Sequence, residues 1–359
     1  MIPEWLRDIL RAHPAYREED VLKTVFQALY GNGHLLADAA AVQMRITTEM
    51  ADGGPDRGEP LTETMDSWLR LNLRPAREAG LAPEWIAEMI RASGYPCVRD
   101  RRAVAAAIAG CGPIPGMDMD RLSDLTETLV SRPGTLPSHS GAVHRLEDPR
   151  YRLMDAAWEP LLPIFQAVAQ LPDDQPQLIT IDGRCGSGKS TLAEALRLVL
   201  GCPVVHTDDF VIPHGMKTAE RLALPGGNED VDRLLAEALI PFQLGAELRP
   251  RRYICSDDRF EEAERIPAGR LLILEGSYSG LPPIAERAGL RVFLRISAED
   301  QWRRLEKRNS PDALRGFRDR WIPLEEAYLS ACGLPDRGCV CLDAMSLRLE
   351  RVLRHSESR

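Results

Sequence analysis

The feature that most restricts how this chain can fold is a glycine-rich run in the second half of its 359 residues. Residues 183–190, GRCGSGKS, match G-x-x-x-x-G-K-[ST] at every fixed position. Apolar residues predict a strand over 177–182 before the run, and helical spacing predicts a helix over 189–200 after it. This order predicts a backbone loop curled around phosphate oxygens at a helix N-terminus. The alternative, a plain glycine-rich turn, is disfavoured because both flanks also fit.

The loop predicts a nucleotide site that uses ATP and Mg²⁺. Lys189 is expected to bridge the β- and γ-phosphates, and the Ser190 hydroxyl is expected to bind Mg²⁺. Such a loop identifies nucleotide binding but not the reaction, because switches and motors also use it. The residues predicted to hold the nucleotide are Gly183, Arg184, Cys185, Gly186, Ser187, Gly188, Lys189, Ser190 and Thr191.

The second half of the chain alternates between apolar strands and helices. Further strands are predicted over 204–206, 270–275, 291–296 and 338–342. Strands separated by helices predict an α/β fold, with a parallel sheet covered by helices on both faces.

The first half has helical periodicity without strand alternation, and we expect an all-α domain there. Residues 1–150 are assigned to this domain, 151–176 to a connecting helix and linker, and 177–359 to the nucleotide-binding domain. The stretch 131–150 is expected to be irregular. The predicted helices cover 19–30, 35–50, 61–73, 83–92, 101–109 and 118–130.

Two carboxylates follow the second predicted strand, in the segment His206-Thr-Asp208-Asp209-Phe210. Ligand sites of α/β sheets lie at the C-terminal ends of the strands, so a carboxylate here could accept a proton from an attacking hydroxyl or hold Mg²⁺. The alternative is that both aspartates only cap the next segment.

Together these motifs resemble the uridine kinase-like branch of phosphate-loop kinases. The resemblance extends to three more segments, RLALPGGN at 221–228, LEGSYS at 274–279 and FRDRWIPLEEAY at 317–328. It covers most of residues 177–330 and implies a kinase that transfers phosphate to a hydroxyl. It also implies that Asp208 is the general base and a metal contact, and that Glu275 reaches Mg²⁺ through water. A buried acid bonded to the loop backbone is the alternative role for Glu275.

The resemblance also places a lid over the phosphates, on the helix that follows the fourth strand. Arg304 and Arg308 are four residues apart and share a helix face, so we expect them to stabilise the transferring phosphoryl group. A solvated basic face paired with Glu299 or Glu306 is the alternative, which fits Arg303 better.

Substrate contacts are predicted by the same resemblance and include positions around the second carboxylate. Ile254 stands where relatives usually carry a polar residue, so the acceptor need not be uridine itself. The predicted contacts are Asp209, Phe210, Asn228, Arg252 and Tyr253.

Composition limits the partners that this chain can have. A net charge of −9 argues against nucleic acid or an anionic membrane, and neither a signal segment nor a membrane-spanning window is evident. Eight scattered cysteines fit a cytoplasmic protein with reduced thiols. Cys339 and Cys341 are expected to be buried thiols rather than a metal site.

The N-terminal half carries two weaker signals, around His34 with Asp38 and around His139. They faintly resemble segments of uncharacterised bacterial proteins, and capping and loop hydrogen bonds are the alternative to a joint site. Three functions therefore stay open: a small-molecule kinase, which the Asp208 and lid residues favour, a kinase for a peptide or larger natural product, and a regulatory ATPase or switch.

Overall fold

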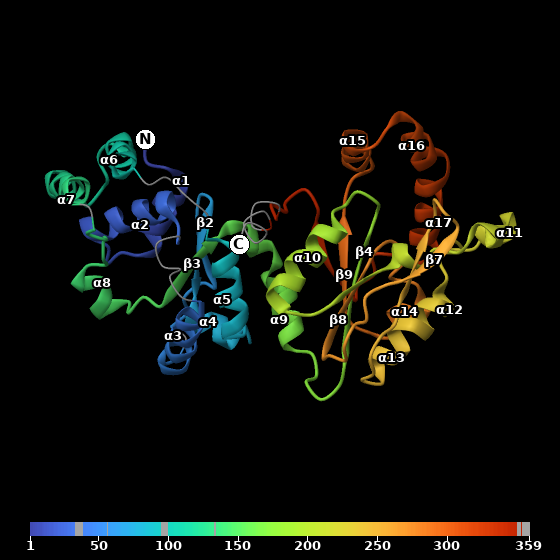
Figure 1. Cartoon of the computed structure of the whole chain (residues 1–359). Coiled ribbons are helices and arrows are strands. Elements are labelled where there is room, and N and C mark those ends of the chain that lie inside the picture. Colours follow the sequence, from blue (N-terminus) through green and yellow to red (C-terminus); the bar gives the residue numbers. More distant parts are fainter. Residues whose placement is uncertain (33–38, 56, 95–99, 133, 350–352, 354–359) are drawn as a thin grey trace. The chain divides into compact units, whose positions relative to one another are not determined.

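The computed structural model describes all residues except 33–38, 56, 95–99, 133, 350–352 and 354–359. The chain forms two compact units, Met1–Leu162 and Pro163–Leu349, each with its own buried core (Figure 1). His34 and Asp38 lie outside the described residues. No helix of the described part is long and apolar enough to cross a membrane.

The first unit is rich in helices, as its periodicity predicted. The helix α5 (Pro83–Ala92) has the predicted bounds, and α2 (Glu18–Tyr30) ends at Gly31, whose φ of 58° suits glycine. Apolar faces of α2, α6 and α7 share one core. The remaining helices are α1 (Glu4–Ala12), α3 (Ala39–Asp52), α4 (Leu73–Glu78), α6 (Arg101–Cys111), α7 (Met119–Ser131) and α8 (Gly141–Leu146).

The expectation of an all-α domain is wrong, because this unit contains an antiparallel sheet in the order β1-β2-β3. The helix predicted over 61–73 is instead a hairpin of β1 (Thr62–Met65) and β2 (Trp68–Asn72). Asp66, at φ 56°, allows the tight turn between them. Every residue of β2 is buried, although its sequence alternates apolar Leu69 and Leu71 with polar Arg70 and Asn72. This short period-2 pattern is the strand signal that the helix prediction overlooked.

The predicted domain boundary is also wrong in its details. The connecting helix expected from residue 151 begins as β3 (Tyr151–Asp155), which pairs with β2 inside the first unit. The second unit begins near the helix α9 (Leu162–Ala169). Within the stretch expected to be irregular, α8 forms because Ser140 caps its N-terminus by accepting a hydrogen bond from the Val143 amide.

The second unit contains the predicted parallel sheet, in the order β10-β9-β4-β8-β5. Figure 1 shows α9 and α10 on one side of this sheet, and α13, α14 and α17 on the other. The strands are β4 (Gln177–Gly183), β5 (Val204–His206), β8 (Leu271–Glu275), β9 (Ala288–Arg295) and β10 (Cys339–Asp343).

The other elements of this unit form its helical layers and a small antiparallel ribbon of β6 with β7. They are α10 (Lys189–Leu200), α11 (Ala219–Leu222), α12 (Val231–Leu234), α13 (Ile240–Gln243), β6 (Arg251–Ile254), β7 (Arg259–Glu262), α14 (Pro282–Ala285), α15 (Ala298–Arg308), α16 (Pro311–Gly316) and α17 (Ile322–Cys332).

Strand register decides which side chains meet at the C-terminal edge of the parallel sheet. β4 and β8 are buried throughout, as expected for central parallel strands. Glu275 at the end of β8 is in register with Ile181 of β4 and with His206 of β5. The ends of these three strands therefore bring the phosphate loop, Glu275 and the Asp208 segment together.

Candidate phosphate-transfer site

The loop between β4 and α10 adopts the conformation that its glycines permit. Gly183, Gly186 and Gly188 have φ values of 141°, 77° and 99°, a region that disfavours other residues. A Cβ atom at Gly183 would lie 2.4 Å from the Leu294 carbonyl oxygen. Glycine is therefore required at the first position by close packing on β9 as well as by the turn.

Lys189 begins α10 and is held inside the curve of the loop. Its Nζ donates to the Gly183 carbonyl at 2.8 Å, to the Arg184 carbonyl at 3.2 Å and to the Ser277 hydroxyl at 3.2 Å. The side chain is buried. This places an ammonium group where the loop backbone can share an anion with it.

Ser190, Glu275 and His206 form a connected group beside Lys189. The Ser190 hydroxyl donates to Glu275 Oε1 at 3.0 Å, and His206 Nδ1 lies 2.5 Å from the same oxygen. The hydrogen bond to Glu275 raises the pKa of His206. Glu275 is buried, but its partners are side chains rather than the loop amides that the alternative role required.

A hydroxyl and a carboxylate in contact fit the way proteins bind Mg²⁺ beside phosphates. Such sites supply one or two oxygens and leave the other positions to water and phosphate. Ser190 and Glu275 provide these oxygens 3.0 Å apart. No group of three or more His, Cys, Asp or Glu side chains able to cage a metal occurs among the described residues, so a metal here would depend on phosphate ligands.

Asp208 follows β5 in a short 3₁₀ turn, Thr207–Phe210. Reduced solvation raises its pKa, and the negative charges of Glu275 and Asp209 act in the same direction, against Lys189 and His206. Its side chain is nevertheless exposed, so the raised pKa reflects concave, charged surroundings rather than full burial. An accessible carboxylate with this affinity for protons is suited to accept one from a substrate.

The predicted substrate contacts are divided by the structure between the surface and the core. Asp209 accepts a hydrogen bond from Arg252 Nε at 2.7 Å, so these two lie together. Phe210 is fully buried, with the Arg233 guanidinium 4.5 Å from its ring centre, and it packs in the core instead of facing a substrate. Tyr253 is buried and its hydroxyl donates to Asp258, whereas Asn228 is buried beside Glu229.

Glu229 is a buried carboxyl group that our sequence analysis missed. Burial raises its pKa well above 4.5, and the charge of Asp208 adds to the effect. Its Oε2 has no hydrogen-bond partner within the described part of the chain. A protonated acid near Asp208 could donate a hydrogen bond to a substrate. In the sequence, the only indication of a role for Glu229 was its position directly after the PGGN segment.

A second missed residue, Glu325 of α17, supports the phosphate loop. It accepts hydrogen bonds from the Cys185 amide at 2.7 Å and from the Ser277 hydroxyl at 2.6 Å. Burial, followed by the charge of Glu325, raises the pKa of the Cys185 thiol to about 12, so this thiol is inert at neutral pH. In the sequence, the indication for Glu325 was the WIPLEEAY segment at 321–328, in which neither glutamate had been assigned a role.

The end of β4 is connected to the same helix by a third buried group. Asp182 accepts hydrogen bonds from the Gly183 amide at 2.6 Å, from the Gly280 amide at 2.9 Å and from the Tyr328 hydroxyl. Burial raises the pKa of this carboxyl group. These bonds fix the first residue of the loop relative to α17.

The arginines predicted to form a lid have different environments. Arg304 NH1 donates to the Gly186 and Ser187 carbonyl oxygens at 3.2 and 2.9 Å, so α15 lies against the phosphate loop. Arg303 pairs with Glu299 and Asp300 on the exposed face, as the alternative reading predicted for it. Arg308 is exposed and forms no ion pair among the described residues.

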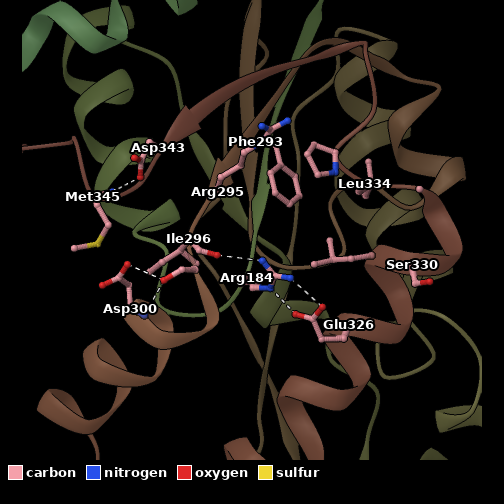
Figure 2. A pocket seen from close by; sticks show the side chains of 14 residues that line it. Arg184, Phe293, Arg295, Ile296, Asp300, Glu326, Ser330, Leu334, Asp343 and Met345 are labelled. Carbon is pink, nitrogen blue, oxygen red and sulfur yellow. Dashed lines mark hydrogen bonds and ion pairs between the residues drawn. The ribbon is translucent and has the colours of Figure 1, made fainter.

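A cavity of about 1020 Å³ opens beside the first variable residue of the loop. Figure 2 shows Arg184 lying between the Ile296 carbonyl, 3.1 Å from its NH1, and the Glu326 carboxylate, 2.5 Å from its Nε. The rest of the lining comes from β9, α15, α17 and β10 and from the loops that follow β9, α17 and β10, and it includes Asp300, Asp343 and Met345. The space is large enough for part of a nucleotide.

Comparison with known proteins gives matches to solved kinase structures over about half of the chain, the C-terminal half. A possible uridine kinase from Bacillus stearothermophilus is 17% identical, with 52% of this chain and 98% of that one covered and a TM-score of 0.42. A gluconokinase from Sinorhizobium meliloti 1021 is 19% identical, with 51% and 93% covered and a TM-score of 0.29. A shikimate kinase from Bacteroides thetaiotaomicron is 18% identical, with 51% and 97% covered and a TM-score of 0.28.

No family model matches the chain, and no curated protein matches its sequence. The identities and TM-scores of the structural matches are low, so the assignment of the fold depends on the strand order and the loop geometry themselves. The C-terminal unit has a five-stranded parallel sheet with helices on both faces and a phosphate loop after the central strand β4. The C-terminal unit thus has the phosphate-loop NTPase type of α/β fold.

Proposed function

We propose that the C-terminal unit is an ATP- and Mg²⁺-dependent kinase that transfers the γ-phosphate to a hydroxyl of a small molecule, nucleoside-like or another metabolite. The observation that carries this proposal is the position of Asp208. Its exposed carboxylate lies within the electrostatic reach of Lys189, His206 and Glu275, beside the phosphate loop. A hydrolytic switch would instead need a group that orients water.

Each residue has a defined part in this reaction. The loop amides and Lys189 bind the β- and γ-phosphates and orient them. Bound at Ser190 and Glu275, Mg²⁺ would offset the phosphate charge. Asp208 accepts the proton of the acceptor hydroxyl, the hydroxyl oxygen forms the new bond to phosphorus, and the bond to the β-phosphate oxygen breaks to release ADP.

The residues around the acceptor have supporting parts. Arg304, which touches the loop carbonyls, is near enough to the phosphates to stabilise charge during transfer, and Arg308 can join it if α15 moves. Asp209 and Arg252 form a partly exposed ion pair next to Asp208 and are the proposed acceptor contacts, whereas the buried Asn228 and Tyr253 support the segments around them.

The test is ADP release from ATP and Mg²⁺ with a panel of nucleosides, sugars, amino-acid-like alcohols and peptides. We expect one class of small hydroxyl compound to stimulate release and to become phosphorylated, and Asp208→Asn to abolish that stimulation. Stimulation by peptides alone would favour a peptide kinase. ADP release that no acceptor changes would favour an ATPase and contradict the proposal.

A further inference from the structure

A continuous series of hydrogen-bonded polar side chains, buried or half-buried, runs through the N-terminal unit. His139 Nδ1 lies 2.8 Å from Asp20 Oδ1, and His139 Nε2 lies 2.7 Å from the Tyr151 hydroxyl. The Tyr151 hydroxyl is 3.1 Å from Gln27 Nε2, and Gln27 Oε1 accepts from Arg70 NH2 at 2.9 Å. Asp20 and Arg70 are fully buried. His139 is thus part of a connected group and not an isolated loop residue.

The protonation states of Asp20 and His139 determine which atom donates in each of these hydrogen bonds. Burial acts to raise the pKa of Asp20, but hydrogen bonds from His139 and Ser140 outweigh it and lower the value to about 2, so Asp20 is a carboxylate. Burial lowers the pKa of His139 to about 4, so the ring is neutral at pH 7. His139 therefore donates from Nδ1 to Asp20 and accepts at Nε2 from Tyr151.

The Tyr151 oxygen remains able to accept one more hydrogen bond. Its proton is directed to His139, and Gln27 Nε2 donates to one lone pair because Gln27 Oε1 is already used by Arg70. The Arg70 guanidinium lies 4.7 Å from the centre of the Tyr151 ring. These hydrogen bonds hold the Tyr151 hydroxyl in one orientation, and the positive charge of Arg70 lies over the face of its ring.

Tyr151 lines a cavity of about 450 Å³ that lies within the same unit. Two cations on its wall, Lys23 and Arg45, form no ion pair among the described residues, whereas Arg152 pairs with Glu49 at 2.7 Å. With three cations in its described lining and Glu49 as the one carboxylate there, this cavity carries excess positive charge. Such a cavity favours an anionic ligand.

A buried acceptor on the same wall lacks a partner. Asn32 is 1% exposed, and its Nδ2 donates to the carbonyl oxygens of Ile90 and Leu153 at 3.0 and 3.1 Å, which fixes the orientation of the amide. Its Oδ1 has no hydrogen-bond partner within the described part of the chain. A buried unpaired oxygen is costly, so a ligand that donates a hydrogen bond would be favoured here.

We propose that the cavity beside Tyr151 is a second ligand site, which binds a small metabolite bearing a carboxylate or phosphate and a hydroxyl group. Lys23 and Arg45 attract the anionic group. The Tyr151 and Asn32 oxygens accept hydrogen bonds from the hydroxyl group. This site is independent of the phosphate loop and of the kinase proposal, because its residues all belong to the first unit.

The test uses two matched pairs of probes, malate with succinate and glycerol 3-phosphate with propyl phosphate. Binding to the full chain is measured by calorimetry with the phosphate loop saturated by a non-hydrolysable ATP analogue and Mg²⁺. We expect the hydroxylated member of one pair to bind more tightly, and the preferred pair identifies the anionic group. Absence of binding by all four probes would overturn the proposal.

Two variants place the binding in this cavity. The double variant Lys23→Met with Arg45→Met should lower the affinity for the preferred probe at least about tenfold, because neither cation has an ion-pair partner among the described residues. A tenfold loss of affinity corresponds to about 1.4 kcal/mol of binding free energy. Arg7→Met with Arg102→Met removes the same charge from exposed positions outside the cavity lining and should leave binding unchanged. Equal effects of the two double variants would show that only net charge matters and would overturn the site.

A single-atom change tests the role of the phenol oxygen. Tyr151→Phe should remove most of the preference for the hydroxylated probe and leave the affinity for its hydroxyl-free partner nearly unchanged. If Tyr151 had only a structural role, the substitution would lower the affinity for both probes equally. That result, or a preference that survives the substitution in a folded protein, would contradict the assigned contact.

Discussion

Lys189 and Asp208 are the residues on which phosphate transfer would depend most directly, and the fold holds them differently. Lys189 is buried and bonded to two loop carbonyls, so its position is fixed before any substrate binds. Asp208 is exposed and has a raised pKa, so it is available for proton transfer. Their loss should therefore have different kinetic consequences.

Lys189→Ala should reduce phosphate transfer by at least about 10²-fold, because a preorganised positive charge at the phosphates is lost. The protein should remain folded by circular dichroism. Lys307→Ala, which removes an exposed lysine from α15, is the control and should retain full turnover. Normal transfer by a folded Lys189→Ala protein would contradict the role of the loop.

Asp208→Asn should lower kcat by about 10²–10⁴-fold while changing ATP affinity little, because the amide keeps the shape and loses the basicity. Asp209→Asn is the matched comparison. Since Asp209 is paired with Arg252, its loss should mainly raise KM for the acceptor. If Asp209→Asn proves the more damaging to kcat, the general base has been assigned to the wrong carboxylate.

Glu229 makes stability depend on pH in a predictable direction. The pKa of Glu229 in the folded state lies well above 4.5. Its favourable contribution to the free energy of unfolding is therefore complete below pH 4.5 and is lost as pH rises towards the folded-state pKa. Glu229→Gln should therefore gain stability relative to the native protein as pH rises above about 4.5, by at most about 1.4 kcal/mol per pH unit. Urea unfolding at several pH values measures this, and exposed Glu262→Gln should show no such trend.

At the scale of elements, the phosphate loop depends on α17 as much as on the strand and helix that flank it. Glu325 binds the Cys185 amide and the Ser277 hydroxyl, and Tyr328 binds Asp182 at the end of β4. Sequence alone predicted β4 and α10 correctly, since both follow from local periodicity. It could not assign a role to Glu325, because the contact spans 140 residues.

Glu325→Gln should weaken ATP binding and lower Tm, because a charged acceptor of two hydrogen bonds becomes a neutral one, at a cost of about 1.5–3 kcal/mol. The adjacent Glu326→Gln removes the same charge from a partly exposed pair with Arg184 and should cost less than about 1 kcal/mol. Thermal unfolding and calorimetric ATP titration compare the two. Equal losses would indicate a general charge effect rather than support of the loop.

At the scale of the whole molecule, the chain consists of two units, and the strand β3 belongs to the first, which extends to Leu162. Tyr151–Asp155 pairs with β2, so a cut at residue 152 would split this sheet. A cut at Pro163 would leave both the sheet and the phosphate-loop unit intact. The complete set of proposed phosphate contacts lies in the second unit.

A fragment spanning Pro163–Leu349 should bind ATP with nearly the affinity of the full chain. A fragment that begins at Arg152 carries most of an unpaired strand and should be less soluble. Calorimetric titration of the first fragment, with circular dichroism to confirm folding, is the measurement. If the well-folded fragment fails to bind ATP, the first unit contributes to the nucleotide site.

The sequence by itself determined the phosphate loop, the five parallel strands and the position of Asp208, because these depend on local glycine conformation and on short-range periodicity. Only the tertiary structure revealed the β1-β2-β3 sheet as a whole, because its middle strand β2 pairs with the distant strand β3. The same holds for Glu229, Glu325 and the Asp20–His139–Tyr151 chain. Their burial and partners arise from contacts between distant segments, which no local pattern encodes.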